Sequence, residues 1–127
     1  MFIQRLCGLA MMVGLVTAGC GGSDIDPVEA CNEVADGLCN RFYACYSAAE
    51  RATGGLPATE GDCTTMFQAS SSCSTHTAAN QCAGGGTYHG DQASVCSEQI
   101  HELTCAVVRD PDFDQNTAAP ACAKVCS

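Results

Sequence analysis

The 127-residue sequence contains no tryptophan and few basic residues. Five Lys and Arg residues stand against fourteen Asp and Glu residues, which gives a formal net charge of −9 at pH 7. Such an acidic surface repels phosphate backbones and anionic headgroups, so we expect no nucleic-acid partner. The longest uncharged apolar run, residues 6–16, is shorter than the roughly 20 residues that a membrane-spanning helix needs.

Large aliphatic side chains are also scarce, whereas cysteine is abundant. From residue 20 onward, Leu, Ile, Val and Phe together number fourteen in 108 residues. This is about 13%, a fraction that with high net charge is typical of disordered chains. The chain has twelve cysteines, ten of them between residues 31 and 126, and no pair has the C-x-x-C spacing of a zinc site. We therefore predict five disulfides, each stabilising the domain by about 2–4 kcal/mol, in an oxidising compartment.

The N-terminal segment has the features of an export signal. Arg5 precedes the apolar run, and Thr17-Ala18-Gly19 stands directly before Cys20. A basic residue, a short apolar core and small residues before a cleavage point are typical of secretory signal peptides. With its cysteine in this place, the segment resembles a bacterial lipoprotein precursor. The resemblance implies that residues 1–19 are removed, that Cys20 carries the lipid, and that Gly21 allows sorting to the outer membrane. Small, acidic, cysteine-rich chains of this build resemble lipoproteins common in myxobacteria, most of which have no assigned activity.

Ordinary cleavage after Ala18 is the alternative, because Val16 and Ala18 also fit a small-residue cleavage rule. Thr17 also stands where the lipoprotein motif usually has Leu. Cysteine parity favours lipidation. Removal of Cys7 with the signal leaves eleven cysteines, an odd number, whereas acylation of Cys20 leaves ten for pairing.

The remainder of the chain predicts one small helical domain. We expect a flexible tether over residues 20–26 and a cysteine-rich helical domain over 27–127. Asp26-Pro27 is a typical helix start, and the apolar spacing that follows indicates a helix from 27 to 47. Further helices are predicted over 60–72, 91–108 and 118–126, with loops over 49–61 and 74–90 and an acidic turn over 110–116. The predicted fold is mainly α, a disulfide-stapled bundle of three to four short helices with long loops.

Helix geometry restricts the pairing of the ten cysteines, because a bridge needs Cα atoms about 4.4–6.8 Å apart. At a rise of about 1.5 Å per residue, no two cysteines of the first helix can pair with each other. The same spacing excludes Cys63–Cys73 and Cys96–Cys105 if their helices are intact. We favour Cys45–Cys63, which flanks the first loop, and leave the other pairings open. The predicted disulfide cysteines are Cys31, Cys39, Cys45, Cys63, Cys73, Cys82, Cys96, Cys105, Cys122 and Cys126.

Few residues suggest chemistry, and we predict no catalytic residues and no cofactor. Cys39 and Cys122 are the candidate reactive thiols, because each has a cation close in sequence. The three histidines are scattered, without the close pair of a hydrolytic zinc site. Tyr43 is the candidate for an aromatic binding patch.

An acidic run near the C-terminus suggests a metal site only in part. Oxygen-bearing side chains alternate there as at the opening of a calcium loop, at Asp110, Asp112, Asp114 and Asn116. Gln115 stands where the helix–loop–helix pattern needs Gly, and Ala121 where its bidentate Glu belongs. We expect a solvated acidic turn, with a weak calcium site as the alternative.

Together these features predict a non-enzymatic surface lipoprotein that is held at the membrane by its lipid. The folded part would be a rigid binding or structural module for a protein, glycan or ion. The alternative is a secreted or anchored redox protein or enzyme whose site the sequence does not reveal.

Overall fold

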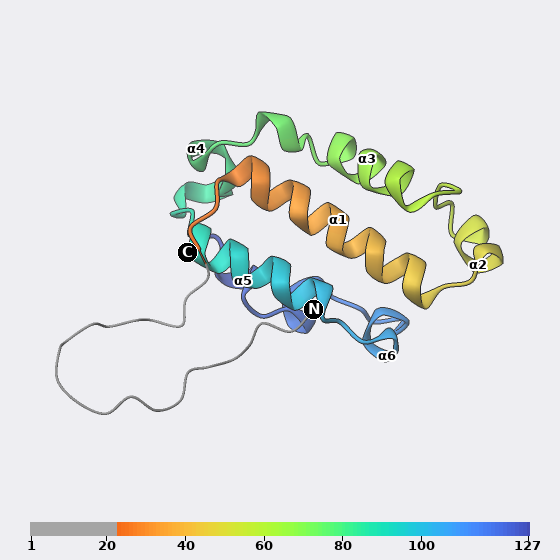
Figure 1. Cartoon of the computed structure of the whole chain (residues 1–127). Coiled ribbons are helices and arrows are strands. Elements are labelled where there is room, and N and C mark those ends of the chain that lie inside the picture. The colour runs from red at the N-terminus through yellow and green to blue at the C-terminus, as the bar shows by residue number, and fades with distance from the viewer. Residues whose placement is uncertain (1–22) are drawn as a thin grey trace, which may run out of the picture.

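The computed structural model describes residues 23–127, which form a mainly helical domain without strands in that range. The predicted signal peptide, Cys20 and the start of the tether lie outside these residues. Within the described part, no helix is long and apolar enough to cross a membrane. Three helices lie side by side, with α1 (Pro27–Cys45) between α3 (Glu60–Ser70) and α5 (Gly90–His101) (Figure 1).

The predicted first helix is confirmed as α1. The Asp26 carboxylate accepts hydrogen bonds from the backbone N–H groups of Val28 and Glu29, at 2.9 and 3.0 Å, and Pro27 opens the helix. Asp26 therefore satisfies two of the four donors that a helix start leaves unpaired. The helix ends at Cys45, because Tyr46 takes an extended conformation.

The last residues of the predicted tether are part of the folded domain. The Tyr88 hydroxyl donates to the Ile25 carbonyl at 2.9 Å, and burial together with the charges of Asp26, Asp24 and Glu29 raises the pKa of Tyr88 to about 12. A Cβ on Gly90 would lie 2.0 Å from Asp24 Oδ1, so only glycine permits this close approach. The chain is thus held from residue 24 onward.

The predicted loop over 49–61 contains a helix, α2 (Ala48–Thr53), so that prediction is wrong there. Ser47 and Glu50 form a capping box, in which the Ser47 hydroxyl accepts from the Glu50 N–H and the Glu50 carboxylate accepts from the Ser47 N–H. This S-x-x-E signal is present in the sequence and starts a helix even where glycines follow closely. The predicted second helix is confirmed as α3, which ends two residues early, before Ser72 with φ 54°.

The predicted loop over 74–90 holds three short helical turns: η1 (Cys73–Thr75), α4 (Ala78–Gln81) and η2 (Ala83–Gly85). This segment returns the chain to the start of α1, so that α5 runs parallel to α1 and α3 runs antiparallel to it (Figure 1). A local cap again explains the helical turn at α4, because Thr77 and Asn80 form a second capping box.

The predicted helix over 91–108 is divided in two, and the predicted helix over 118–126 is wrong over most of its length, because only Ala118 and Cys122–Lys124 are helical within it. α5 ends at His101 and α6 (Cys105–Val108) starts afresh, with the Thr104 hydroxyl as its N-cap. Near the C-terminus, α7 (Gln115–Ala118) ends before Ala119-Pro120, and η3 (Cys122–Lys124) follows. The proline disfavours helical backbone in the residue before it, which accounts for the second break.

All ten cysteines in the described residues are paired, which confirms the prediction of five disulfides. The bridges are Cys31–Cys73, Cys39–Cys63, Cys45–Cys105, Cys82–Cys126 and Cys96–Cys122. None is one of the pairs that helix geometry excludes.

The favoured pair Cys45–Cys63 is wrong. Because α2 carries the chain beyond the end of α1 before α3 turns back, Cys63 lies beside Cys39, with Cα atoms 5.9 Å apart. The break after α5 then turns Cys105 toward Cys45, at 5.1 Å. The disulfide pairing therefore depends on how far the segments between the helices carry the chain, and the spacing of the cysteines alone does not predict this.

Sulfur forms much of the core. Of the four largest side chains that are fully buried, three are cysteines (Cys39, Cys63 and Cys73) and the fourth is Ile100. The hydrophobic core cluster joins α5 to α6 and the C-terminal segment and contains Cys96, Ile100, Leu103, Val108, Ala119 and Ala121. Covalent links thus occupy positions that aliphatic side chains fill in most domains.

Candidate functional site

Neither candidate reactive thiol is free in the folded domain. Cys39 is bonded to Cys63, and both are completely buried. Cys122 is bonded to Cys96. Arg41 lies two residues after Cys39 in the sequence, but its guanidinium contacts the Cys45–Cys105 bridge. Proximity in sequence therefore does not predict which bridge this cation contacts.

The acidic run near the C-terminus uses its oxygens locally. Asp110 Oδ1 accepts from the Asp112 N–H at 2.9 Å, and Asp114 Oδ1 accepts from the Thr117 N–H at 2.8 Å as the cap of α7. Among residues 23–127, no three His, Cys, Asp or Glu side chains gather closely enough to hold a metal ion. The arrangement therefore corresponds to a capped acidic turn.

Tyr43 is also engaged within the domain. Its hydroxyl donates to the Pro57 carbonyl, and the guanidinium of Arg51 lies over its ring, 4.3 Å from the centroid. Both contacts hold Tyr43 against residues of its own chain.

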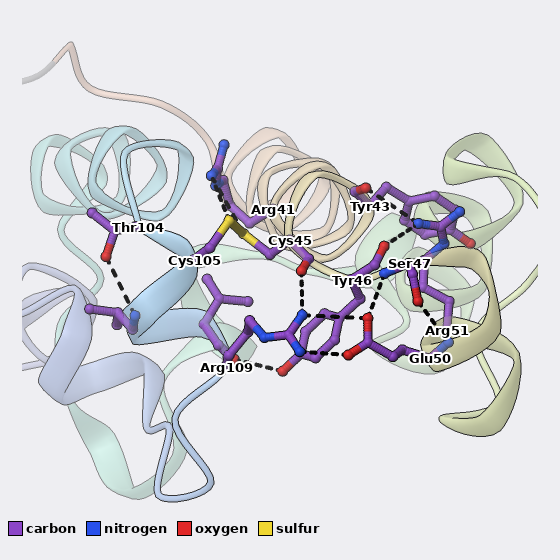
Figure 2. Close-up of a disulfide and its surroundings, with 12 residues drawn as sticks. Arg41, Tyr43, Cys45, Tyr46, Ser47, Glu50, Arg51, Thr104, Cys105 and Arg109 are labelled. Carbon is purple, nitrogen blue, oxygen red and sulfur yellow. Dashed lines mark hydrogen bonds and ion pairs between the residues drawn. A yellow bond between two sulfur atoms is a disulfide. The ribbon is translucent and has the colours of Figure 1, made fainter.

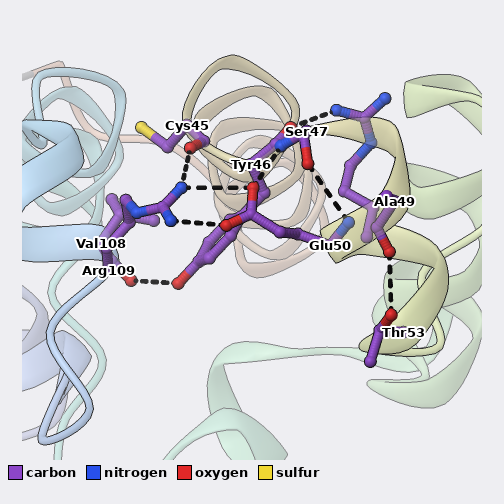
Figure 3. A network of polar contacts seen from close by, with 9 residues as sticks. Cys45, Tyr46, Ser47, Ala49, Glu50, Thr53, Val108 and Arg109 are labelled. Atoms are coloured by element: carbon purple, nitrogen blue, oxygen red, sulfur yellow. Dashed lines mark hydrogen bonds and ion pairs between the residues drawn. The ribbon is translucent and has the colours of Figure 1, made fainter.

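A polar network joins the end of α1 to α2 and α6 (Figure 3). Arg109 donates to the Cys45 carbonyl at 2.7 Å and pairs with Glu50 at 2.5 Å, and its guanidinium lies 4.9 Å from the centre of the Tyr46 ring. The Tyr46 hydroxyl donates to the Val108 carbonyl at 3.0 Å. The hydrogen bond from Arg109, with further bonds from Ser47, lowers the pKa of Glu50 to about 2. We call this set of contacts the α1–α6 junction.

An open groove of about 700 Å³ lies between the polar sides of α1, α3 and α5. Four carboxylates line it, from Glu33, Asp36, Glu98 and Glu102, and His101 lies among them. The groove concentrates negative charge on one part of the surface.

A more enclosed cavity of about 430 Å³ lies on the other side of α1. Its wall is largely apolar and includes Ala30, Val34 and Leu38 from α1, Phe67 from α3 and Val125 near the C-terminus. The side chains of His76 and Gln81 also line it, and His76 Nδ1 and Gln81 Oε1 are buried without a hydrogen-bond partner in the protein. A buried polar atom without a hydrogen bond destabilises the folded state by about 1–3 kcal/mol, so we expect both atoms to bind a partner from outside the chain.

The sequence did not single out this cavity. Scattered histidines and the predicted loop over 74–90 do not indicate it, because nothing in the spacing of His76 and Gln81 shows that both line one cavity with residues of α1. The signal that was available is the Thr77–Asn80 capping box, which orders the segment between them. No protein-family model, curated protein or solved structure matches this chain.

Proposed function

We propose that the chain is an exported surface lipoprotein, anchored in the outer membrane through Cys20, whose folded domain is a non-enzymatic binding module. The pairing of all ten cysteines from 31 to 126 supports the anchor, because once Cys7 is removed with the signal none of them is available to pair with Cys20. An unmodified Cys20 would be a stray thiol in an oxidising compartment. Five disulfides by themselves indicate export.

The cavity over α1 is the binding site in this proposal, and the observation that carries it is the pair of unpartnered atoms His76 Nδ1 and Gln81 Oε1. Its volume falls within the range of about 300–1,000 Å³ that is usual for small-molecule sites. The apolar wall fits a hydrocarbon body. A ligand group that both donates and accepts a hydrogen bond can satisfy the two polar atoms together.

The ligand class that follows is a small neutral amphiphile with a hydroxyl or primary amide group. Gln81 Oε1 only accepts, so the ligand must donate to it, whereas His76 Nδ1 donates in one tautomer and accepts in the other, and a hydroxyl or primary amide can match either. A carboxylate has no proton to offer to Gln81. It would also approach a domain with fourteen acidic and four basic residues after residue 20.

Photolabelling tests this site on the full chain in the membranes of an exporting bacterial host. The probe is an eight-carbon alkanol that carries a diazirine, and the comparison probe is the carboxylate of the same length. We expect the alkanol to label peptides within 30–38, 67–81 and 115–126, and the carboxylate to label them at least tenfold less.

Two variants and a matched control define the site further. Gln81→Leu removes the acceptor and should weaken labelling about tenfold. Ser71→Phe places a ring at the exposed rim of the cavity and should block entry. Gln68→Leu makes the same exchange as Gln81→Leu but faces the acidic groove, so labelling should be unchanged. Equal labelling by both probes, or labelling that is unaltered in Gln81→Leu and Ser71→Phe, contradicts the binding site.

Intact mass spectrometry of protein extracted from membranes tests the anchor separately. We expect an acylated chain that begins at Cys20 and gains ten hydrogens on full reduction, two for each of the five bridges. Cys20→Ser should abolish acylation and leave the bridges in place. An unacylated chain that starts at Gly19 and carries one alkylatable thiol would support the plain secreted form instead.

A further inference from the structure

The five disulfides differ in their access to solvent. Four of them include at least one cysteine with an exposed fraction of 6% or less. In Cys45–Cys105, neither cysteine is buried. A soluble thiol can therefore approach either sulfur of this bridge, whereas each of the other four bridges has at least one buried cysteine.

Cys45–Cys105 is also the bridge with a cation against its sulfurs. Arg41 Nη2 lies 3.7 Å from Cys45 Sγ and 4.0 Å from Cys105 Sγ (Figure 2). In residues 23–127 the one ion pair is Arg109–Glu50, so no carboxylate of that range neutralises Arg41. Arg41 Nε is in addition buried without a hydrogen-bond partner. The guanidinium thus has the capacity to stabilise a negative charge on either sulfur.

The α1–α6 junction surrounds the same bridge with non-covalent contacts. Arg109 links the Cys45 carbonyl to Glu50, and Tyr46 holds the Val108 carbonyl (Figures 2 and 3). These contacts do not need the sulfur–sulfur bond. They keep α6 against the end of α1 after the bond is cleaved, so that the two thiols stay within reach of each other.

From these three observations we propose that Cys45–Cys105 is a reversible thiol-exchange site, opened by a dithiol reductant while the other four bridges stay closed. A thiolate of the dithiol bonds to one sulfur of the bridge, and the other sulfur leaves as a thiolate beside Arg41. The second thiolate of the dithiol then attacks the dithiol's own sulfur in the mixed disulfide, so that the bond to the cysteine breaks and that cysteine leaves as the second thiolate, which takes up a proton from water according to pH. The bridge has gained two electrons, its sulfurs become a thiol and a thiolate or two thiols, and the dithiol has become a disulfide. Binding in the cavity does not require this chemistry.

Arg41 should favour the open form, because its charge stabilises the leaving thiolate and the reduced product. At about 4 Å, Coulomb attraction near a protein surface is large enough to change an equilibrium tenfold or more. If Arg41 acted only through packing, its substitution would loosen the surroundings of the bridge and raise the equilibrium constant for reduction. The direction of the change in an Arg41 variant therefore separates the electrostatic role from a structural one.

The test equilibrates the full exported chain in mixtures of reduced and oxidised dithiothreitol, followed by alkylation in acid and peptide mass spectrometry. We expect Cys45 and Cys105 to be alkylated first, with the other eight cysteines still paired and the helical circular dichroism retained. Arg41→Met should lower the equilibrium constant for reduction of this bridge about tenfold, and Arg41→Lys should restore most of it. Arg51→Met is the matched control, because Arg51 lies at the same end of α1 but stacks on Tyr43 and contacts no sulfur.

Three results would overturn the proposal. The first is reduction of another bridge before Cys45–Cys105, with Cys82–Cys126 as the strongest competitor because Cys126 is exposed. The second is an equilibrium constant that is unchanged or raised in Arg41→Met. The third is loss of the helical signal as soon as Cys45–Cys105 opens.

Discussion

At the scale of single residues, three of the four Lys and Arg side chains in residues 23–127 make contacts within the domain. Arg41, Arg51 and Arg109 all lie around the end of α1, where they contact sulfur, backbone carbonyls and aromatic rings. Their positive charge offsets the carbonyls that a helix end leaves unpaired. The remainder of the surface keeps its acidic character, including the groove between α1, α3 and α5.

Glu50→Gln should lower the melting temperature slightly at neutral pH, by no more than about 5 °C, because a largely exposed ion pair is screened by solvent. The pKa of Glu50 is lowered from 4.5 to about 2 in the folded state. Its contribution is therefore fully present above pH 4.5 and is lost as the pH falls toward 2. Calorimetry between pH 4.5 and pH 2 should show that the melting temperatures of Glu50→Gln and of the unaltered chain converge as the pH falls. Glu98→Gln, at an exposed position in the acidic groove, is the control, and convergence in that pair as well would contradict the assignment to Glu50.

At the scale of elements, the close approach of α1 and α5 depends on a glycine. A Cβ on Gly37 would lie 3.0 Å from Ile100 Cγ2 and from two atoms of the His101 ring. Ile100 is completely buried, so it has little room to move. The absence of a side chain at Gly37 therefore lets the two parallel helices pack closely.

A pair of glycine substitutions tests this packing. Gly61→Ala in α3 meets no atom within 4 Å and should stabilise the domain by up to about 1 kcal/mol through helix propensity. Gly37→Ala gains the same propensity but overpacks the α1–α5 contact, so we expect a net loss of about 1 kcal/mol. Chemical denaturation measures both. A stabilised Gly37→Ala domain would show that α5 shifts outward without cost.

At the scale of the whole molecule, covalent links take the place of an aliphatic core. The bridges close loops of 24 to 60 residues. Each such closure removes unfolded-state entropy worth about 3–4 kcal/mol, and the net stability of an ordinary domain is only about 5–15 kcal/mol. The fold should therefore depend on its sulfur atoms as a group.

Complete reduction with a strong reductant should abolish both the cooperative thermal transition and most of the helical circular dichroism. Because α1 is long and well capped, some residual helix is expected, but no cooperative melt. For comparison, the domain in which only Cys45–Cys105 is reduced should still unfold in a cooperative thermal transition. A cooperative transition that survives full reduction would show that apolar packing alone holds the fold.

Patterns within a few residues predict α1 and α3 correctly, because both helices depend on contacts along a single helix. The caps of α1 and the periodicity of α3 act over one or two turns, and the exclusion of Cys63–Cys73 follows from the rise of a single helix. Two capping boxes, Ser47–Glu50 and Thr77–Asn80, carry the same kind of local information within the two segments that are predicted as loops. The break at Thr104 is not predicted, because a regular apolar spacing continues through it.

The sequence alone determined that this is a small, acidic, helical domain whose cysteines pair, since composition and cysteine parity limit how so few apolar side chains can fold. Only the tertiary structure decided which cysteines pair, that Arg41 lies against Cys45–Cys105, and that His76 and Gln81 close a cavity over α1. These contacts join residues far apart in the chain, and they depend on where the segment between α3 and α5 returns the chain. No pattern with a range of a few residues can specify that path.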